Sequence, residues 1–303
     1  MSTVASPIRS APARGVKSPP IAFWGAVVGF LLALYWDVIP GMVRIWMEDP
    51  GYSHGVLVPP LALYVAWLHK DEIEAIPPGQ DLRGVVLTAF GCLIYMIGRL
   101  GAEFFLTRIS LVFVLAGIAL TFWGAQRFSK LIFAFFLLAT MVPIPAIIYN
   151  RLAAPLQLFA SWVSAEALQL MGIPVFRDGN ILNLAEIKLG VAEACSGLRS
   201  ISSLTVLALV VGYFVNRKIS IRALLFLLAF PTAIAANVLR IIVTALAARH
   251  DADLARGLFH SFSGWVVFLV GFIALYGMAM GLARLEGKGS DAGAEETADQ
   301  PPC

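Results

Sequence analysis

Residues 221–248 read IRALLFLLAFPTAIAANVLRIIVTALAA, and only two of them, Arg222 and Arg240, carry a charge. The run is longer than the roughly 20 apolar residues that cross a bilayer as a helix. The whole chain is also apolar, since 59% of its 303 residues are hydrophobic and only 14% are charged. Soluble domains have about 25% charged residues. The sequence therefore predicts an all-α polytopic membrane protein.

Apolar runs of this kind predict about eight transmembrane helices. They are expected at residues 21–43, 56–69, 84–102, 108–125, 130–149, 198–216, 221–248 and 261–284. The second run is short and contains Pro59 and Pro60. Residues 1–20 and 286–303 flank this membrane domain of residues 21–285. Their composition, rich in small and polar residues, predicts disordered tails.

Lys and Arg residues at the ends of the expected helices predict the orientation of the chain. Short cytoplasmic loops carry an excess of positive residues. Arg127, Lys130, Arg217 and Lys218 lie directly at helix ends. We assign their loops and both termini to the cytoplasm, which leaves residues 150–197 as the long extracytoplasmic stretch.

This stretch is expected to hold two small elements. Residues 151–172 are amphipathic and are expected to lie at the membrane interface or to re-enter the membrane. Asp178-Gly179 is a pair typical of tight hairpin turns, and apolar or β-branched residues flank it. A small β-hairpin is therefore expected, and it would lead directly into Ala194-Cys195-Ser196-Gly197-Leu198-Arg199.

Cys195 stands at the expected outer end of the helix at 198–216. The positive end of a helix dipole favours the thiolate form of a cysteine there. Ser196 and Gly197 suit a helix start, and Gly197 leaves room for a substrate backbone. The alternative is that Cys195 is a small packing residue. The three cysteines of the chain form neither a disulfide framework nor a zinc pattern.

Arg240 lies inside an apolar run, where a charge is costly and usually functional. If the helix begins near Ala223, Arg240 lies about 25 Å along its axis. This is near the outer edge of a roughly 30 Å hydrocarbon core, at the expected level of Cys195. Asn237 lies one turn earlier on the same face. The alternative role for Arg240 is to extend toward a lipid phosphate.

His260 opens the last expected helix, also on the outer side. Three helices would thus each bring one reactive side chain to one level of one membrane face. A thiolate, an imidazole and a guanidinium suit acyl transfer through a thioester. His54 is also expected outside, where it would bind substrate, act as the base instead of His260, or only shape its loop. No metal or nucleotide motif is present, so no cofactor is predicted.

Three stretches, at residues 194–199, 237–240 and 260–264, are similar to the signature stretches of the exosortase/archaeosortase family. The stretch DPGYSHGVLVP at residues 49–59 resembles the family's first extracytoplasmic loop. The resemblance covers roughly residues 20–285. It implies a membrane cysteine transpeptidase with Cys195 as nucleophile and Arg240 and His260 completing the triad. The residues expected to bind substrate or support the site are Ser196, Gly197, Arg199, Asn237 and His54.

The resemblance also implies a substrate and a place in the cell. The substrates would be exported proteins with a C-terminal sorting signal: a short motif such as Pro-Glu-Pro, a transmembrane helix and a basic cluster. The expected location is the inner membrane of a Gram-negative-type bacterium, with the site facing outward, membrane lipid as a partner and the acceptor nucleophile unknown. Nucleic acid is not expected, because the net charge is only +3. The competing interpretation is a non-catalytic membrane component of exopolysaccharide export or transport.

Overall fold

A computed structural model describes most of the chain. The described residues are 20–49, 51–185, 187–191, 198–215, 218–250 and 258–298, of which 198–200, 250, 258–263 and 286–298 are described by their backbone alone. The chain forms two compact units. The first comprises Met1–Val43 and Val58–Val142, and the second comprises Arg44–Leu57 and Pro143–Cys303.

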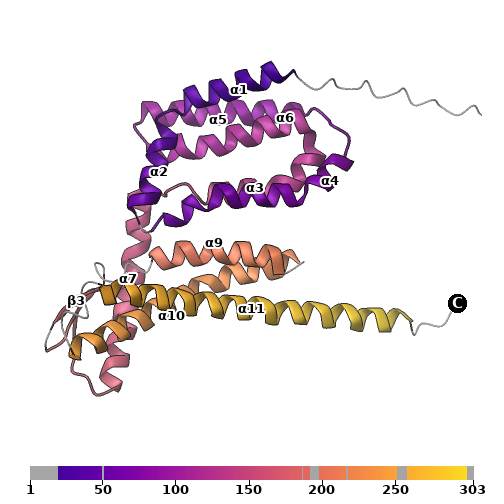
Figure 1. The fold of residues 1–303 in the computed structure, drawn as a ribbon. Coiled ribbons are helices and arrows are strands. Elements are labelled where there is room, and N and C mark those ends of the chain that lie inside the picture. Colours follow the sequence, from indigo (N-terminus) through magenta and orange to yellow (C-terminus); the bar gives the residue numbers. More distant parts are fainter. Residues whose placement is uncertain are drawn as a thin grey trace, which may run out of the picture. The chain divides into compact units, whose positions relative to one another are not determined.

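The first unit consists of helices. They are α1 (Ile21–Leu34), the first half of α2 (Val38–Glu48), α3 (Val58–Leu68), α4 (Lys70–Ala75), α5 (Leu82–Leu100) and α6 (Phe104–Ala139). Helices α5 and α6 pack side by side (Figure 1). Glycines on α5 allow this close approach, since a Cβ atom on Gly91 would lie 2.7 Å from the Val114 side chain.

Helix α6 joins two segments that the sequence analysis predicts as separate spans, at 108–125 and 130–149. Its two arms meet at Gly124, whose φ of 74° is not helical and is readily adopted only by glycine. The second arm ends at Ala139, ten residues earlier than expected. Pro143 and Pro145 follow, and proline disfavours the continuation of a helix because it lacks the backbone N–H.

The expected number of eight spans is not confirmed. Among the described residues, four helices are long and apolar enough to cross a membrane: α5, α6, α10 at Ile219–Arg249 and α11 at Gly264–Leu285. A fifth is added if α1 and α2, which meet at a bend of 62°, form one broken span. The expected spans at 56–69 and 198–216 correspond to apolar helices shorter than a full span, Val58–Leu68 and Ile201–Val215.

The second unit combines helices with a small sheet. Besides residues 44–57 it contains α7 (Ala146–Leu170), β1 (Phe176–Asp178), β2 (Ile181–Asn183), β3 (Lys188–Gly190), α9 (Leu198–Val215), α10 (Ile219–His250) and α11 (Leu258–Ala298). Helix α10 packs against both α9 and α11 (Figure 1). The fully buried side chains of Leu204, Leu225, Ala229 and Leu275 form the core between these three helices.

The hairpin expected at Asp178-Gly179 is present as the antiparallel pair β1–β2, in which Asp178 lies opposite Ile181. Gly179 has a φ of 62° at the first position of the two-residue turn, which is typical of a type II′ hairpin. The third strand, β3, is not part of the sequence prediction. The sheet and α7 pack on the C-terminal half of α10, with Leu182, Val191 and Ile241 in the shared core.

Two further segments belong to helices whose bounds the sequence analysis does not give. Residues 151–172 belong mostly to α7, which begins at Ala146 and buries Ser161 and Ser164. Helix α11 continues to Ala298, through a stretch whose composition predicts disorder. The expected N-terminal tail lies outside the described residues, apart from Pro20.

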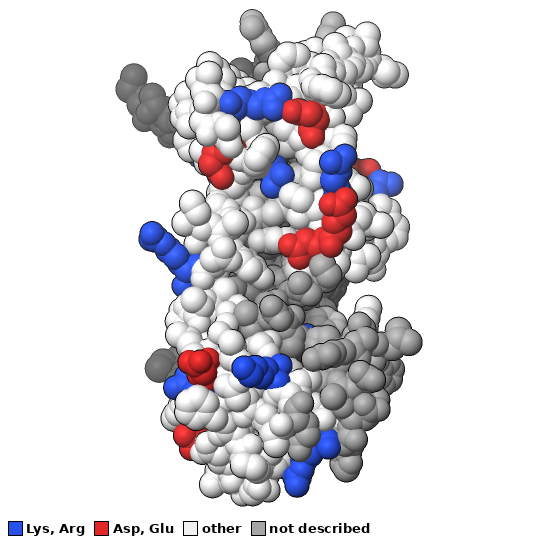
Figure 2. Space-filling model, turned by 90° about the vertical axis from the view of Figure 1, so that its left-hand side faces the viewer, with Lys and Arg blue, Asp and Glu red and all other residues white. Residues whose placement is uncertain are grey.

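The surface of the described residues is rich in exposed apolar side chains. Phe30 on α1, Leu93 on α5 and Trp265 on α11 are each more than half exposed, at 65%, 52% and 75%. In Figure 2 the Lys, Arg, Asp and Glu residues form small separate groups, and most of the described surface in this view is uncharged. Side chains of this kind suit contact with lipid rather than with water.

Candidate functional site

The chain is anchored on both sides of the segment that contains Cys195. Cys195, Ser196 and Gly197 themselves lie outside the described residues. Before them, the fully buried Val191 donates a backbone hydrogen bond of 2.9 Å to the carbonyl oxygen of Asn180 in the hairpin turn. After them, Leu198 begins α9. The sequence therefore places the cysteine in a link between the sheet and a helix start.

Helices α9, α10 and α11 meet closely at Gly271. A Cβ atom there would lie 3.1 Å from the side chain of Leu204 on α9 and 3.6 Å from that of Ala236 on α10. At 1.5 Å per residue, Leu198 at the start of α9 lies about 9 Å along the axis from Leu204. On α11, Gly264 lies about 10 Å from Gly271, toward the same end of the three helices. These two points therefore share one level of the helix bundle.

Arg240 joins them at this level. The terminal nitrogen Nη2 of Arg240 would lie 3.0 Å, and Cζ 3.1 Å, from a Cβ atom on Gly264. The guanidinium thus lies directly against the backbone of α11, where only a hydrogen stands in place of a side chain. Gly264 is one turn after His260, which is part of α11 and is described by its backbone alone.

Asn237 lies one turn before Arg240 on α10 and is only 4% exposed. Its Oδ1 atom has no hydrogen-bond partner among the described residues. A buried polar atom without a partner costs about 1–3 kcal/mol. The Oδ1 atom of Asn237 is therefore suited to accept a hydrogen bond from a ligand that binds in the site. Arg199, the other residue expected to support the site, lies in the first turn of α9 and is described by its backbone alone.

The loop that follows α2 belongs to the same unit. The hydroxyl of Ser202 on α9 donates a hydrogen bond of 3.0 Å to the carbonyl oxygen of Gly51. The amide of Gly51 in turn donates to Oδ1 of Asp49 at 2.8 Å. Ser202 is seven residues after Cys195, so this contact attaches the loop after α2 to the helix that follows the cysteine stretch in sequence.

His54 lies in the short 3-10 helix of this loop, Ser53–Val56. The ring of Tyr52 is 6.5 Å from that of His54 and 6.3 Å from that of Tyr149 at the start of α7. The aromatic group of Tyr52, His54 and Tyr149 is therefore held beside α9. Trp46 fixes the other side of the loop, because its indole lies so close to Gly55 that a Cβ atom there would overlap it.

Sequence reasoning missed Ser202 and Tyr149 as parts of this arrangement. It places Gly264 one turn from His260 in the third signature stretch but gives it no role. No local pattern distinguishes Ser202 from the other serines of the chain, and its role depends on a contact across 151 positions of sequence.

These features define a helical membrane protein in which the guanidinium of an arginine on α10 lies against the backbone of α11. The family model of transmembrane exosortases matches residues 46–277, which is more than two thirds of the chain. The match includes the loop after α2, the three signature stretches and the sheet. The chain therefore belongs to the transmembrane exosortase family. Comparisons with curated proteins and with solved structures return no significant match.

Proposed function

We propose that the protein is a membrane cysteine transpeptidase that cleaves the C-terminal sorting signals of exported proteins through a thioester. The observation that carries the proposal is the position of the Arg240 guanidinium. It lies against Gly264, one turn from His260, and level with the start of α9, which Cys195 precedes by three residues. Family membership supports the same chemistry.

In the proposed reaction the Cys195 thiolate attacks the scissile carbonyl carbon, and a carbon–sulfur bond forms. Arg240 donates hydrogen bonds to the oxyanion that develops on the carbonyl oxygen. His260 gives a proton to the leaving amine as the carbon–nitrogen bond breaks, which leaves a thioester on Cys195. His260 then takes a proton from the acceptor nucleophile, which attacks the thioester and releases the thiolate.

The supporting residues have separate proposed roles. Asn237 uses its buried Oδ1 to accept a hydrogen bond and so orient a group beside Arg240. Ser196, Gly197 and Arg199 shape the place where the substrate backbone lies. His54 lies in the loop after α2, which is hydrogen-bonded to α9 through Gly51 and Ser202. It binds the segment of the substrate next to the scissile bond.

The thioester is the test of the proposal as a whole. Purified protein in proteoliposomes is expected to cleave a substrate that carries a sorting signal. Hydroxylamine added to the reaction should attack the thioester and yield a C-terminal hydroxamate at the cleavage site, detected by mass spectrometry. A protein that leaves the substrate intact, or that cleaves it without hydroxamate, would contradict the proposal and favour the export-component interpretation.

We place the site on the outer face of the inner membrane, because the basic residues at 127–130 and 217–222 should remain in the cytoplasm. Cysteines introduced one at a time into a cysteine-free variant test this with an impermeant maleimide. A cysteine at Asn216 should stay unlabelled in intact cells, and one at Asp178 should react. The opposite pattern would overturn the orientation.

The two histidines are separated by their effect on pH dependence. Imidazole titrates near neutral pH, so processing by the unaltered protein is expected to vary with pH. His260→Ala should lower the rate about a hundredfold and remove this dependence, because the general acid is lost. His54→Ala should weaken substrate binding and retain the pH profile. If His54→Ala removes the pH-dependent step and His260→Ala keeps it, the roles are reversed.

A further inference from the structure

A second candidate site lies in the first unit and includes none of the residues proposed for the reaction. Helices α3 and α4 and the second arm of α6 enclose an apolar groove with a volume of about 450 Å³. Leu63 and Ala66 line it from α3, and Leu131, Ala134, Phe135 and Leu138 line it from α6. The groove is open to the surface, where Leu63 is 72% exposed.

The length of the groove limits what can occupy it. Helix α3 has 11 residues and is therefore about 16 Å long. This is close to half of the roughly 30 Å hydrocarbon thickness of a bilayer. A transmembrane helix needs a groove across both leaflets, whereas one phospholipid chain extends through a single leaflet. The groove therefore has the length of a lipid chain.

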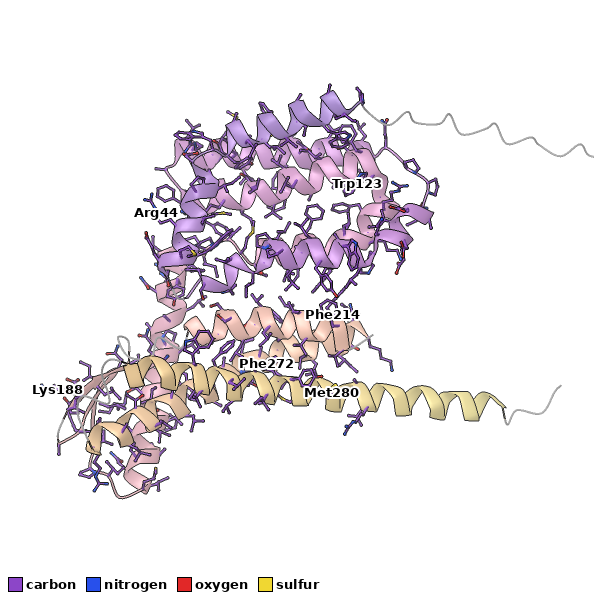
Figure 3. The ribbon with its side chains drawn as sticks, viewed as in Figure 1. Arg44, Trp123, Lys188, Phe214, Phe272 and Met280 are labelled. Atoms are coloured by element: carbon purple, nitrogen blue, oxygen red, sulfur yellow. The ribbon has the colours of Figure 1, made fainter. Side chains whose placement is uncertain are left out.

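One end of the groove has the residues of a membrane interface. Trp67 and Trp123 line it there, and Figure 3 shows Trp123 on the part of α6 near α4. Tryptophan prefers the level of the lipid headgroups. Lys70 and Glu74 of α4 line the same end, with 3.8 Å between Nζ and Oε1 and with side chains 59% and 66% exposed.

The charges at this end are balanced: the three acidic residues of α4, Asp71, Glu72 and Glu74, match Lys70, Arg127 and Lys130 in number. Lys130 pairs with Glu72 at 2.7 Å, and this hydrogen bond holds the pKa of Glu72 below its ordinary value. Arg127 donates two hydrogen bonds to the carbonyl oxygen of Ile76. A patch without net positive charge does not attract anionic lipid. One lysine and one glutamate at the groove suit a headgroup that itself carries one negative and one positive charge.

We propose that this groove binds a phospholipid with a phosphoethanolamine headgroup. The acyl chain lies between α3 and the second arm of α6, the phosphate contacts Lys70, and the ammonium donates hydrogen bonds to Glu74. A choline headgroup has no N–H to donate to Glu74, so it binds less well. The inference does not depend on the proposed function.

Native mass spectrometry of the full chain tests this. The protein is exchanged into nanodiscs of equimolar dioleoyl phosphatidylethanolamine, phosphatidylcholine and phosphatidylglycerol, and the lipid that remains bound is then measured. We expect phosphatidylethanolamine to exceed each of the other two at least threefold. Equal retention of the three lipids, or a preference for phosphatidylglycerol, would overturn the proposal.

Three variants assign the signal to the groove. Ala66→Trp fills the apolar part and should remove the bound lipid, whereas Leu93→Trp, on an exposed position of α5, should bind as the unaltered protein does. Glu74→Gln changes only an exposed side chain and should abolish the preference for phosphatidylethanolamine over phosphatidylcholine. An unchanged preference in Glu74→Gln contradicts the headgroup assignment even if Ala66→Trp fails to fold. A photoreactive residue at position 63 should crosslink to lipid. A crosslink to the helix of a sorting signal instead would overturn the lipid proposal.

Discussion

Cys195→Ser is expected to reduce processing of the sorting-signal substrate by more than about a thousandfold, with the protein still folded and inserted in the membrane. Serine has nearly the same size as cysteine. Its hydroxyl is far less acidic than a thiol, however, so almost none of it is ionised near neutral pH. The rate of substrate cleavage in proteoliposomes measures the effect, and membrane extraction with thermal unfolding measures insertion and stability.

Cys92→Ser is the matched control for this variant. Cys92 lies in the middle of α5, partly buried, and none of the proposed steps involves it. The control should process substrate at the unaltered rate. Near-normal cleavage by Cys195→Ser would end the thioester hypothesis, because the thioester cannot form without the thiol.

Arg240→Lys is expected to lose about a hundredfold in the rate of processing. The guanidinium presents several donors in a fixed plane, whereas the ammonium of lysine is a compact charge on a flexible stem. The guanidinium of Arg240 lies in contact with Gly264, and lysine does not reproduce the group that fills this position. Single-turnover cleavage at saturating substrate measures the chemical step apart from binding. A rate within twofold of the unaltered protein would remove Arg240 from the oxyanion role.

Gly264→Ala tests the same position from the other helix. The new methyl group would lie 3.0 Å from Nη2 of Arg240 and would push the guanidinium aside by a few tenths of an ångström. Alanine stabilises a helix relative to glycine by up to about 1 kcal/mol, so the melting temperature should not fall. Activity should fall about tenfold, since small displacements of a catalytic group are costly. Gly277→Ala, on the same helix with no atom within 4 Å, should gain the stability and keep the activity.

The spacing of glycines does not by itself predict which helices pack together. The stripes Gly25-x-x-x-Gly29 and Gly277-x-x-x-Gly281 look like helix-packing faces in sequence, yet a Cβ atom on any of the four would meet nothing within 4 Å. The glycines that do bring helices together include Gly91 of α5, against Val114 of α6, and Gly271 of α11, against Leu204 of α9. A small residue permits close approach, but it does not determine which helix approaches.

The sequence alone determined the features that depend on local chemistry. Its apolar runs indicate membrane helices, since a spanning backbone must satisfy its own hydrogen bonds. Asp178-Gly179 indicates the hairpin, because glycine suits the positive φ of such a turn, and the turn itself consists of Gly179 and Asn180. Arg240 was singled out because a charge within an apolar run is costly.

Only the tertiary structure decided which distant segments meet. It attaches the loop at Gly51 to Ser202 of α9, adds β3 to the hairpin and places the Arg240 guanidinium against Gly264. It also decided the lengths of the helices, because Gly124 turns the chain within α6 and α3 stops after half a membrane thickness. Such contacts result from the packing of whole surfaces, and no short stretch of sequence contains the partner against which it will pack.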